Sequence, residues 1–180
     1  YNDFNHTSAA TQYLVQRSLN HWIDEYKIDG YRFDLAKGFT QTASNTSTVE
    51  NYDPSRVQNI ERYYDGTVSG HPGTYMILEF LGTLPCAEEQ EYAAHGLMLW
   101  DNASGLASQC TMGFTSNSDL SLLSYNSSQK NYNNPAAVGY MERHDEERSM
   151  YRNITFGNSS GGYTVSTLAT ALAREEAAAA

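Results

Sequence analysis

Three acidic residues, Asp34, Glu79 and Asp145, each lie at or just beyond the end of a short run of strand-forming residues. If these runs are strands of one parallel sheet, their carboxyl ends share an edge, and the three side chains meet there. Glycosidic cleavage needs such convergent carboxylates, because one protonates the leaving oxygen while another meets the positive charge that develops at the anomeric carbon. Each acid alone is better explained as an exposed strand end or half of a salt bridge, so the prediction depends on the three together.

Two basic side chains accompany these acids. Arg32 lies two residues before Asp34, on the same face of an extended strand. A charge-assisted hydrogen bond between them would keep Asp34 ionised and oriented. His144 directly precedes Asp145 and is suited to hydrogen-bond the hydroxyls of a substrate.

The elements that must position these side chains alternate between strand and helix. Strands are predicted over residues 31–35, 75–80, 96–100 and 136–142. Helices are predicted over 7–28, 54–65, 86–95 and 163–180, with a helical piece at 120–125 and an irregular loop at 40–53. The alternation predicts a parallel α/β sheet, as in a (β/α) barrel or a doubly wound fold. No Gly-rich phosphate-binding loop follows a strand, which counts against nucleotide binding.

The composition narrows the class of partner. The 180 residues carry 11 Lys and Arg against 21 Asp and Glu, a formal charge of −10, which does not suit nucleic acid because phosphates need basic partners. No run approaches the roughly 18 to 20 consecutive apolar residues of a membrane span. The 14 Tyr residues, with many Asn, Ser and Thr, suit the faces and hydroxyls of sugars, but they are equally typical of a Tyr- and Asn-rich extracellular protein.

Three segments resemble sequence motifs of the α-amylase family (glycoside hydrolase family 13). Residues 30–37, Gly-Tyr-Arg-Phe-Asp-Leu-Ala-Lys, resemble the Gly-aromatic-Arg-aromatic-Asp-Ala-x-Lys-His motif at the end of the fourth barrel strand of that family. Residues 77–79 resemble the motif of its fifth strand, and residues 141–145, Met-Glu-Arg-His-Asp, resemble the Phe-Val-Glu-Asn-His-Asp of its seventh. Their order and spacing also agree with the family, and the resemblance covers essentially the whole chain.

The resemblance implies an incomplete (β/α)8 TIM barrel, about strands 4 to 7 with their helices, in which residues 1–180 form one partial catalytic domain. It implies the following roles: Asp34 as nucleophile, Glu79 as general acid/base, Asp145 as transition-state stabiliser, Arg32 as partner of the nucleophile, His144 as a contact for sugar hydroxyls and Lys37 as a side chain on the leaving-group side. Two positions depart from the family. Gly38 stands where many members have His, and Arg143 replaces the usual Asn.

The expected function is therefore retaining hydrolysis of α-1,4-glucosidic bonds in starch-like glucans. The alternatives are a related transglycosylase or isomerase with the same three acids, and a relative that binds carbohydrate without catalysis. The family implies possible calcium, whose ligands cannot be assigned in this segment, and secretion. Whether Cys86 and Cys110 pair is left open.

The two ends of the sequence lead to a separate expectation. The chain starts at Tyr1 without an initiator Met and stops in the apolar run 177–180, so we expect both ends to be cuts in a longer chain. An incomplete barrel exposes unpaired strand edges, and we therefore expect the 180 residues alone to be poorly soluble or inactive.

Overall fold

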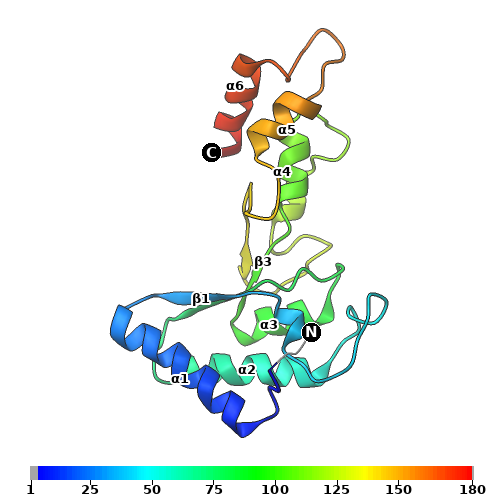
Figure 1. Cartoon of the computed structure of the whole chain (residues 1–180). Helices are drawn as coiled ribbons and strands as arrows, with labels where there is room; N and C mark the ends of the chain where they lie inside the picture. Colours follow the sequence, from blue (N-terminus) through cyan, green and yellow to red (C-terminus); the bar gives the residue numbers. More distant parts are fainter. Residues whose placement is uncertain (1–3, 180) are drawn as a thin grey trace. The chain divides into compact units, whose positions relative to one another are not determined.

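The computed structural model describes residues 4–179, which form an α/β fold with a four-stranded parallel sheet and six α-helices (Figure 1). In chain order the elements are α1 (Ala9–Tyr26), β1 (Gly30–Phe33), the 3-10 helix η1 (Ala36–Gly38), α2 (Pro54–Val68), β2 (Tyr75–Leu78), α3 (Ala87–His95), β3 (Met98–Trp100), α4 (Ser104–Thr111), the 3-10 helix η2 (Leu120–Leu123), β4 (Ala137–Val138), α5 (Ser149–Phe156) and α6 (Leu168–Ala179). The expected α/β class with a parallel sheet is confirmed.

The chain divides into two compact units. The first comprises Tyr1–Trp100 and Tyr125–Val138 and contains the sheet with α1, α2 and α3. The second comprises Asp101–Ser124 and Gly139–Ala180 and contains α4, α5 and α6.

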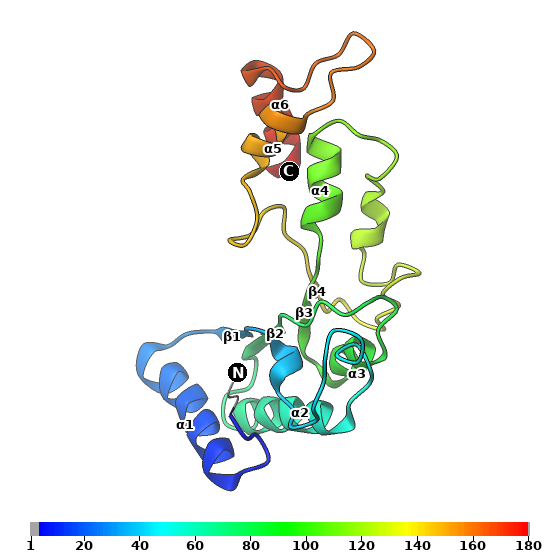
Figure 2. The same cartoon turned by 45° about the vertical axis from the view of Figure 1, so that its right-hand side comes forward.

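The strands of the first unit follow one another in space in the same order as in the sequence, β1-β2-β3-β4. Phe33 pairs with Leu78, and Leu78 in turn pairs with Leu99, so the carboxyl ends of the first three strands share one edge. Figures 1 and 2 show α1, α2 and α3 on the same side of this sheet. The sheet is therefore wound in one direction, with its helices on one face.

Local sequence signals explain where the helices begin and end. Asp53 caps the first turn of α2 by accepting hydrogen bonds from the backbone N–H groups of Ser55 and Arg56, and Pro54 stands at the first helical position. Gly96 ends α3 in the left-handed conformation, with φ of 115°. These signals fix the start of α2 and the end of α3, the helices before and after β2.

The core of the first unit lies between the helices and one face of the sheet. The side chains at its centre are less than 5 % exposed, and they include Val57, Ile60 and Tyr63 of α2, Met76 and Leu78 of β2, and Tyr92 and Leu99 from α3 and β3. Burying each such side chain contributes roughly 1.5 to 3 kcal/mol. The opposite face carries Arg32, Ile77 and Met98 side by side in register, and these residues are only half-buried.

The second unit is a small cluster of helices in which α4, α5 and α6 contact one another. Its buried side chains include Ala107, Val165 and Ala171. Polar side chains join the helices as well. Asn153 of α5 donates to Glu175 of α6 at 2.7 Å, and Arg174 of α6 donates to the Thr111 carbonyl at 3.1 Å.

The elements differ from the sequence predictions in three places. The predicted strand over 136–142 is only Ala137–Val138, and the residues after it are irregular. The closing helix starts at Leu168 rather than near 163. Helices α4 and α5 were not predicted, because their sequences are rich in Ser, Asn and Thr, which read as loop. Among residues 4–179, no helix is both long and apolar enough to cross a membrane.

Candidate active site

Asp34 and Glu79 lie at neighbouring strand ends, each one residue beyond the last residue of its strand. Because Phe33 pairs with Leu78, the sheet register brings the two acids to adjacent positions at the carboxyl edge. The ladder continues one step further, since the Glu79 N–H donates to the Phe33 carbonyl at 3.0 Å. Backbone pairing itself therefore positions both carboxylates.

Arg32 joins the two acids. Its Nη1 donates to Oδ1 of Asp34 at 2.9 Å, and its Nη2 forms an ion pair with Oε2 of Glu79 at 3.0 Å. The sequence prediction that Arg32 contacts Asp34 is confirmed. The two carboxylates differ in their surroundings, because Asp34 is 66 % exposed and Glu79 only 9 %. An exposed and a buried carboxylate thus share a single guanidinium.

The ring of Trp100 packs against the guanidinium of Arg32. The carbon at the centre of the guanidinium lies 3.7 Å from the centroid of the Trp100 ring, which places the cation over the π face. The contact follows from the register, since Trp100 stands two residues after Met98, on the sheet face that also carries Arg32. The ring of Trp100 thus packs against a side chain of the same site.

The turn after Asp34 also contacts Glu79. Leu35 adopts the left-handed conformation with φ of 46°, which is strained for a residue with a side chain and costs on the order of 1 kcal/mol or more. In this conformation its N–H donates to Oε2 of Glu79 at 2.9 Å. The next N–H, that of Ala36, donates to the Glu79 carbonyl at 3.0 Å. The turn thus fixes both the side chain and the backbone of Glu79.

Lys37 lies in η1, directly after this turn. Its Nζ donates to the Leu81 carbonyl at 3.1 Å and forms an ion pair with Glu50. The ammonium also lies 5.4 Å from the centroid of the Phe80 ring. Lys37 therefore connects η1 to the segment after β2. Lys37 lies shortly after Asp34 in the sequence, and its partner Leu81 lies shortly after Glu79.

The third predicted acid belongs to the second unit. Asp145 is 55 % exposed, and its Oδ2 lies 3.5 Å from Nε2 of His144, which is 61 % exposed. Within its unit, this pair is open to solvent. The structure thus brings Arg32, Asp34 and Glu79 together in the first unit and pairs His144 with Asp145 in the second.

The other acids around Asp145 have structural partners. Glu142 accepts from the N–H of Ser149 at 2.7 Å and from Arg148 at 2.9 Å, so it holds the start of α5. Glu146 accepts from Ser104 at 2.8 Å and from Arg143 at 3.1 Å. The guanidinium of Arg143 is therefore paired within the second unit, with the carboxylate of Glu146.

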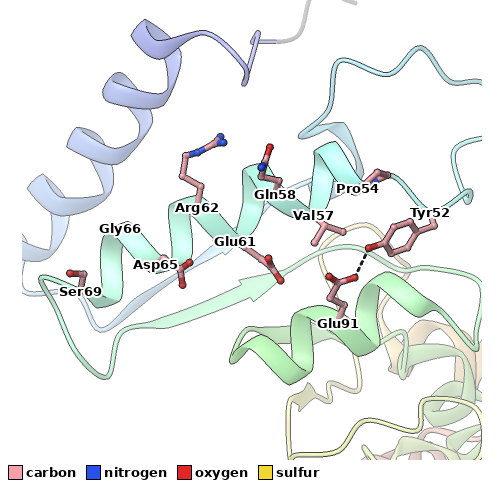
Figure 3. A pocket seen from close by; sticks show the side chains of 10 residues that line it. All are labelled: Tyr52, Pro54, Val57, Gln58, Glu61, Arg62, Asp65, Gly66, Ser69 and Glu91. Atoms are coloured by element: carbon pink, nitrogen blue, oxygen red, sulfur yellow. Dashed lines mark hydrogen bonds between the residues drawn. The ribbon is translucent and has the colours of Figure 1, made fainter.

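A hollow of about 880 Å³ lies elsewhere in the first unit, along α2 and α3 (Figure 3). Its acidic side chains are paired within the protein. Glu91 accepts a hydrogen bond from Tyr52 at 2.6 Å, and Asp65 bonds His95 at 2.8 Å. We therefore do not take this hollow as the candidate active site, because Arg32, Asp34 and Glu79 do not line it.

Within residues 4–179, no three His, Cys, Asp or Glu side chains are grouped so as to hold a metal ion. Cys86 of the first unit and Cys110 of the second are both free thiols, and burial raises the pKa of Cys86.

A comparison of the sequence with models of protein families and with curated proteins finds no match.

Sequence reasoning missed three contributors to this site. The Leu35 N–H carries no side-chain signal, although it donates to the carboxylate of Glu79. Glu50 lies in a polar loop without periodicity, 13 residues from Lys37. The contact of Trp100 with Arg32 depends on two strand pairings that the sequence does not specify.

Proposed function

We propose that this protein is a retaining glycoside hydrolase of α-amylase type that cleaves α-1,4-glucosidic bonds in starch-like glucans. The observation that carries the proposal is the binding of Asp34 and Glu79 by one guanidinium, that of Arg32, at the carboxyl ends of adjacent parallel strands. These residues occupy the motif positions that resemble the catalytic strands of that family. A retaining mechanism requires two carboxyl groups only about 5 to 5.5 Å apart, and a shared cation keeps such a pair close.

The winding of the sheet supports the barrel as the fold of the intact domain. A doubly wound sheet reverses its strand order at a switch point, whereas a (β/α)8 barrel adds each strand beside the last. The strand order β1-β2-β3-β4, with α1, α2 and α3 on one side, agrees with the second pattern. We take these four strands as strands 4 to 7 of the barrel.

In the proposed reaction, Asp34 attacks the anomeric carbon while Glu79 gives a proton to the glycosidic oxygen, so the bond to the leaving sugar breaks as the covalent glycosyl-enzyme forms. Glu79 then removes a proton from water, which attacks the same carbon and releases Asp34. Arg32 orients Asp34 for the attack through a charge-assisted hydrogen bond. The resemblance to the family gives the remaining roles: stabilisation of the transition state for Asp145, contact with sugar hydroxyls for His144 and contact with the sugar on the leaving-group side for Lys37.

Variants at the two carboxylates test the proposal in the natural protein over its whole length. Asp34→Asn removes the proposed nucleophile and Glu79→Gln the proposed acid/base, so each should lower starch hydrolysis by about 10²-fold or more. The matched control is Asp24→Asn, because this acid is 60 % exposed on α1. Retained activity in Glu79→Gln would refute its assignment as acid/base.

A substrate with a good leaving group separates the two roles. An α-maltosyl fluoride needs no proton on its leaving group, so Glu79→Gln should still release fluoride on this substrate, whereas Asp34→Asn should not. Nuclear magnetic resonance of the first sugar released from starch should show the α anomer. Release of the β anomer would contradict retention.

Product analysis discriminates the alternatives. Starch, maltose and sucrose are each incubated with the natural protein: hydrolysis products favour the proposal, and longer or rearranged sugars favour a transglycosylase or an isomerase. Binding of glucan without turnover would favour a carbohydrate-binding protein. The complete group of Arg32, Asp34 and Glu79 argues against that last reading, because binding alone does not need it.

A further inference from the structure

Glu50 lies in the polar loop between η1 and α2 and contacts two segments at once. One carboxylate oxygen pairs with the ammonium of Lys37 in η1, and the other accepts from the N–H of Thr83 at 2.9 Å. Thr83 belongs to the segment that follows β2 and Glu79. Glu50 therefore links the segment after one candidate carboxylate to the segment after the other.

A buried arginine fixes the backbone on both sides of Glu50. Arg56 of α2 is 2 % exposed, and its guanidinium donates to the carbonyls of Val49 at 3.5 Å and Asn51 at 3.0 Å. The same guanidinium donates to the carbonyl of Lys37 at 3.3 Å. One buried side chain of α2 thus holds the backbone of Lys37 and the two residues that flank Glu50.

Charge holds the two side chains together. Burial raises the pKa of Glu50, but hydrogen bonds from Lys37 and Thr83 outweigh burial, so this pKa lies below its ordinary value. Glu50 is 36 % exposed and Lys37 is 20 % exposed, which leaves the pair accessible from solvent. A lysine held in this way has already lost side-chain conformational entropy, so the binding of a ligand costs less entropy at this residue.

We propose that Glu50 is a positioning residue for glucan binding: it orients the ammonium of Lys37 and ties the two segments together, so that Lys37 is ready to bind sugar on the leaving-group side. This inference rests on the proposed function. Glu50 acts on the binding of sugar rather than on bond cleavage, since its carboxylate is engaged by Lys37 and Thr83.

The kinetic test uses Glu50→Gln in the natural protein over its whole length, with Glu25→Gln on α1 as an exposed control. We expect KM for maltooligosaccharides to rise roughly 5- to 20-fold while kcat changes less than about twofold. The same substitution is made in a Lys37→Met background, where it should have no further effect on KM. Glu50→Asp, which keeps the charge, should recover part of the loss. An equal rise in KM in both backgrounds, or an unchanged KM, would overturn the proposal.

A second readout does not depend on turnover. Acetylation of Lys37 by acetic anhydride is followed by mass spectrometry, with Lys27, which is exposed at the end of α1, as the internal reference. Loss of the ion pair should make Lys37 react several-fold faster in Glu50→Gln, while Lys27 is unchanged. Unchanged acetylation of Lys37 in an active protein would overturn this proposal alone. A natural protein that neither binds nor cleaves α-glucans would overturn the proposed function and this inference together.

Discussion

The ion pair between Arg56 and Glu88 is the most deeply buried charge pair described in the first unit, and its disruption should cost a large part of the stability. The two side chains are 3 % and 2 % exposed. Glu88 accepts from Nε of Arg56 at 2.8 Å, from the N–H of Asp53 at 2.7 Å and from the hydroxyl of Tyr92 at 3.2 Å. Arg56→Met leaves the carboxylate buried with only the last two donors. Removing one partner of a buried pair costs about 3 to 5 kcal/mol, and we expect that loss in the free energy of unfolding.

The control and the double variant separate charge from packing. Arg62→Met, on the same helix, removes an arginine whose contact is with the Asn59 side chain at 2.9 Å, and it should cost less than about 1 kcal/mol. Arg56→Met combined with Glu88→Gln removes both charges while the amide oxygen still accepts from the Asp53 N–H. This double variant should be more stable than Arg56→Met alone, with a coupling of about 2 kcal/mol or more.

Urea unfolding followed by far-ultraviolet circular dichroism measures these differences at pH 7. The linear dependence on denaturant gives the free energy of unfolding of each variant. Additive losses in the double variant, or a loss below about 1 kcal/mol in Arg56→Met, would refute the reasoning. The first result would mean that the two charges act independently, and the second that water reaches the pair.

Three further predictions concern other contacts. Trp100→Leu should lower kcat/KM on starch about 3- to 30-fold, because it removes the ring that packs against Arg32. Trp100→Phe keeps an aromatic ring and should keep most of the activity. Equal activity of the two variants would contradict this prediction. The hydrogen bond to Glu91 raises the pKa of Tyr52 to about 12, so ultraviolet titration should find its ionisation shifted downward in Glu91→Gln. Since the folded-state pKa exceeds the unfolded value of about 10, this contact stabilises fully below about pH 10 and is lost as the pH rises towards 12. The N–H of Ser149, the first residue of α5, holds the pKa of Glu142 below its ordinary value, against the effect of burial. The contribution of this contact to stability is therefore present above the ordinary carboxyl pKa and is lost as the pH falls through the lowered pKa of Glu142. Glu142→Ala should cost about 1 kcal/mol at pH 7 and nothing in strong acid, as measured by urea unfolding at both pH values.

The sequence alone determined the elements whose signals are local. The apolar period of α1, the Pro and Asp at the start of α2 and the Gly at the end of α3 each act within one or two turns, and these helices were predicted within a few residues. The strands ahead of Asp34 and Glu79 were also predicted, the first from its alternation of charged and apolar residues and the second from its short run of strand-forming residues. The pairing of Arg32 with Asp34 followed from their spacing of two residues.

Only the tertiary structure decided which distant groups meet. The contact of Arg32 with Trp100 depends on the register of three strands, and register is set by the packing of a whole sheet face rather than by any one segment. The bond from the Leu35 N–H to Glu79 needs a left-handed turn that a leucine does not favour and that the surrounding contacts impose. Glu50 meets Lys37 because a buried arginine anchors the loop between them. Such contacts join residues far apart in the chain, so they form and stabilise the protein only once the core has folded. No local pattern of residue types predicts them.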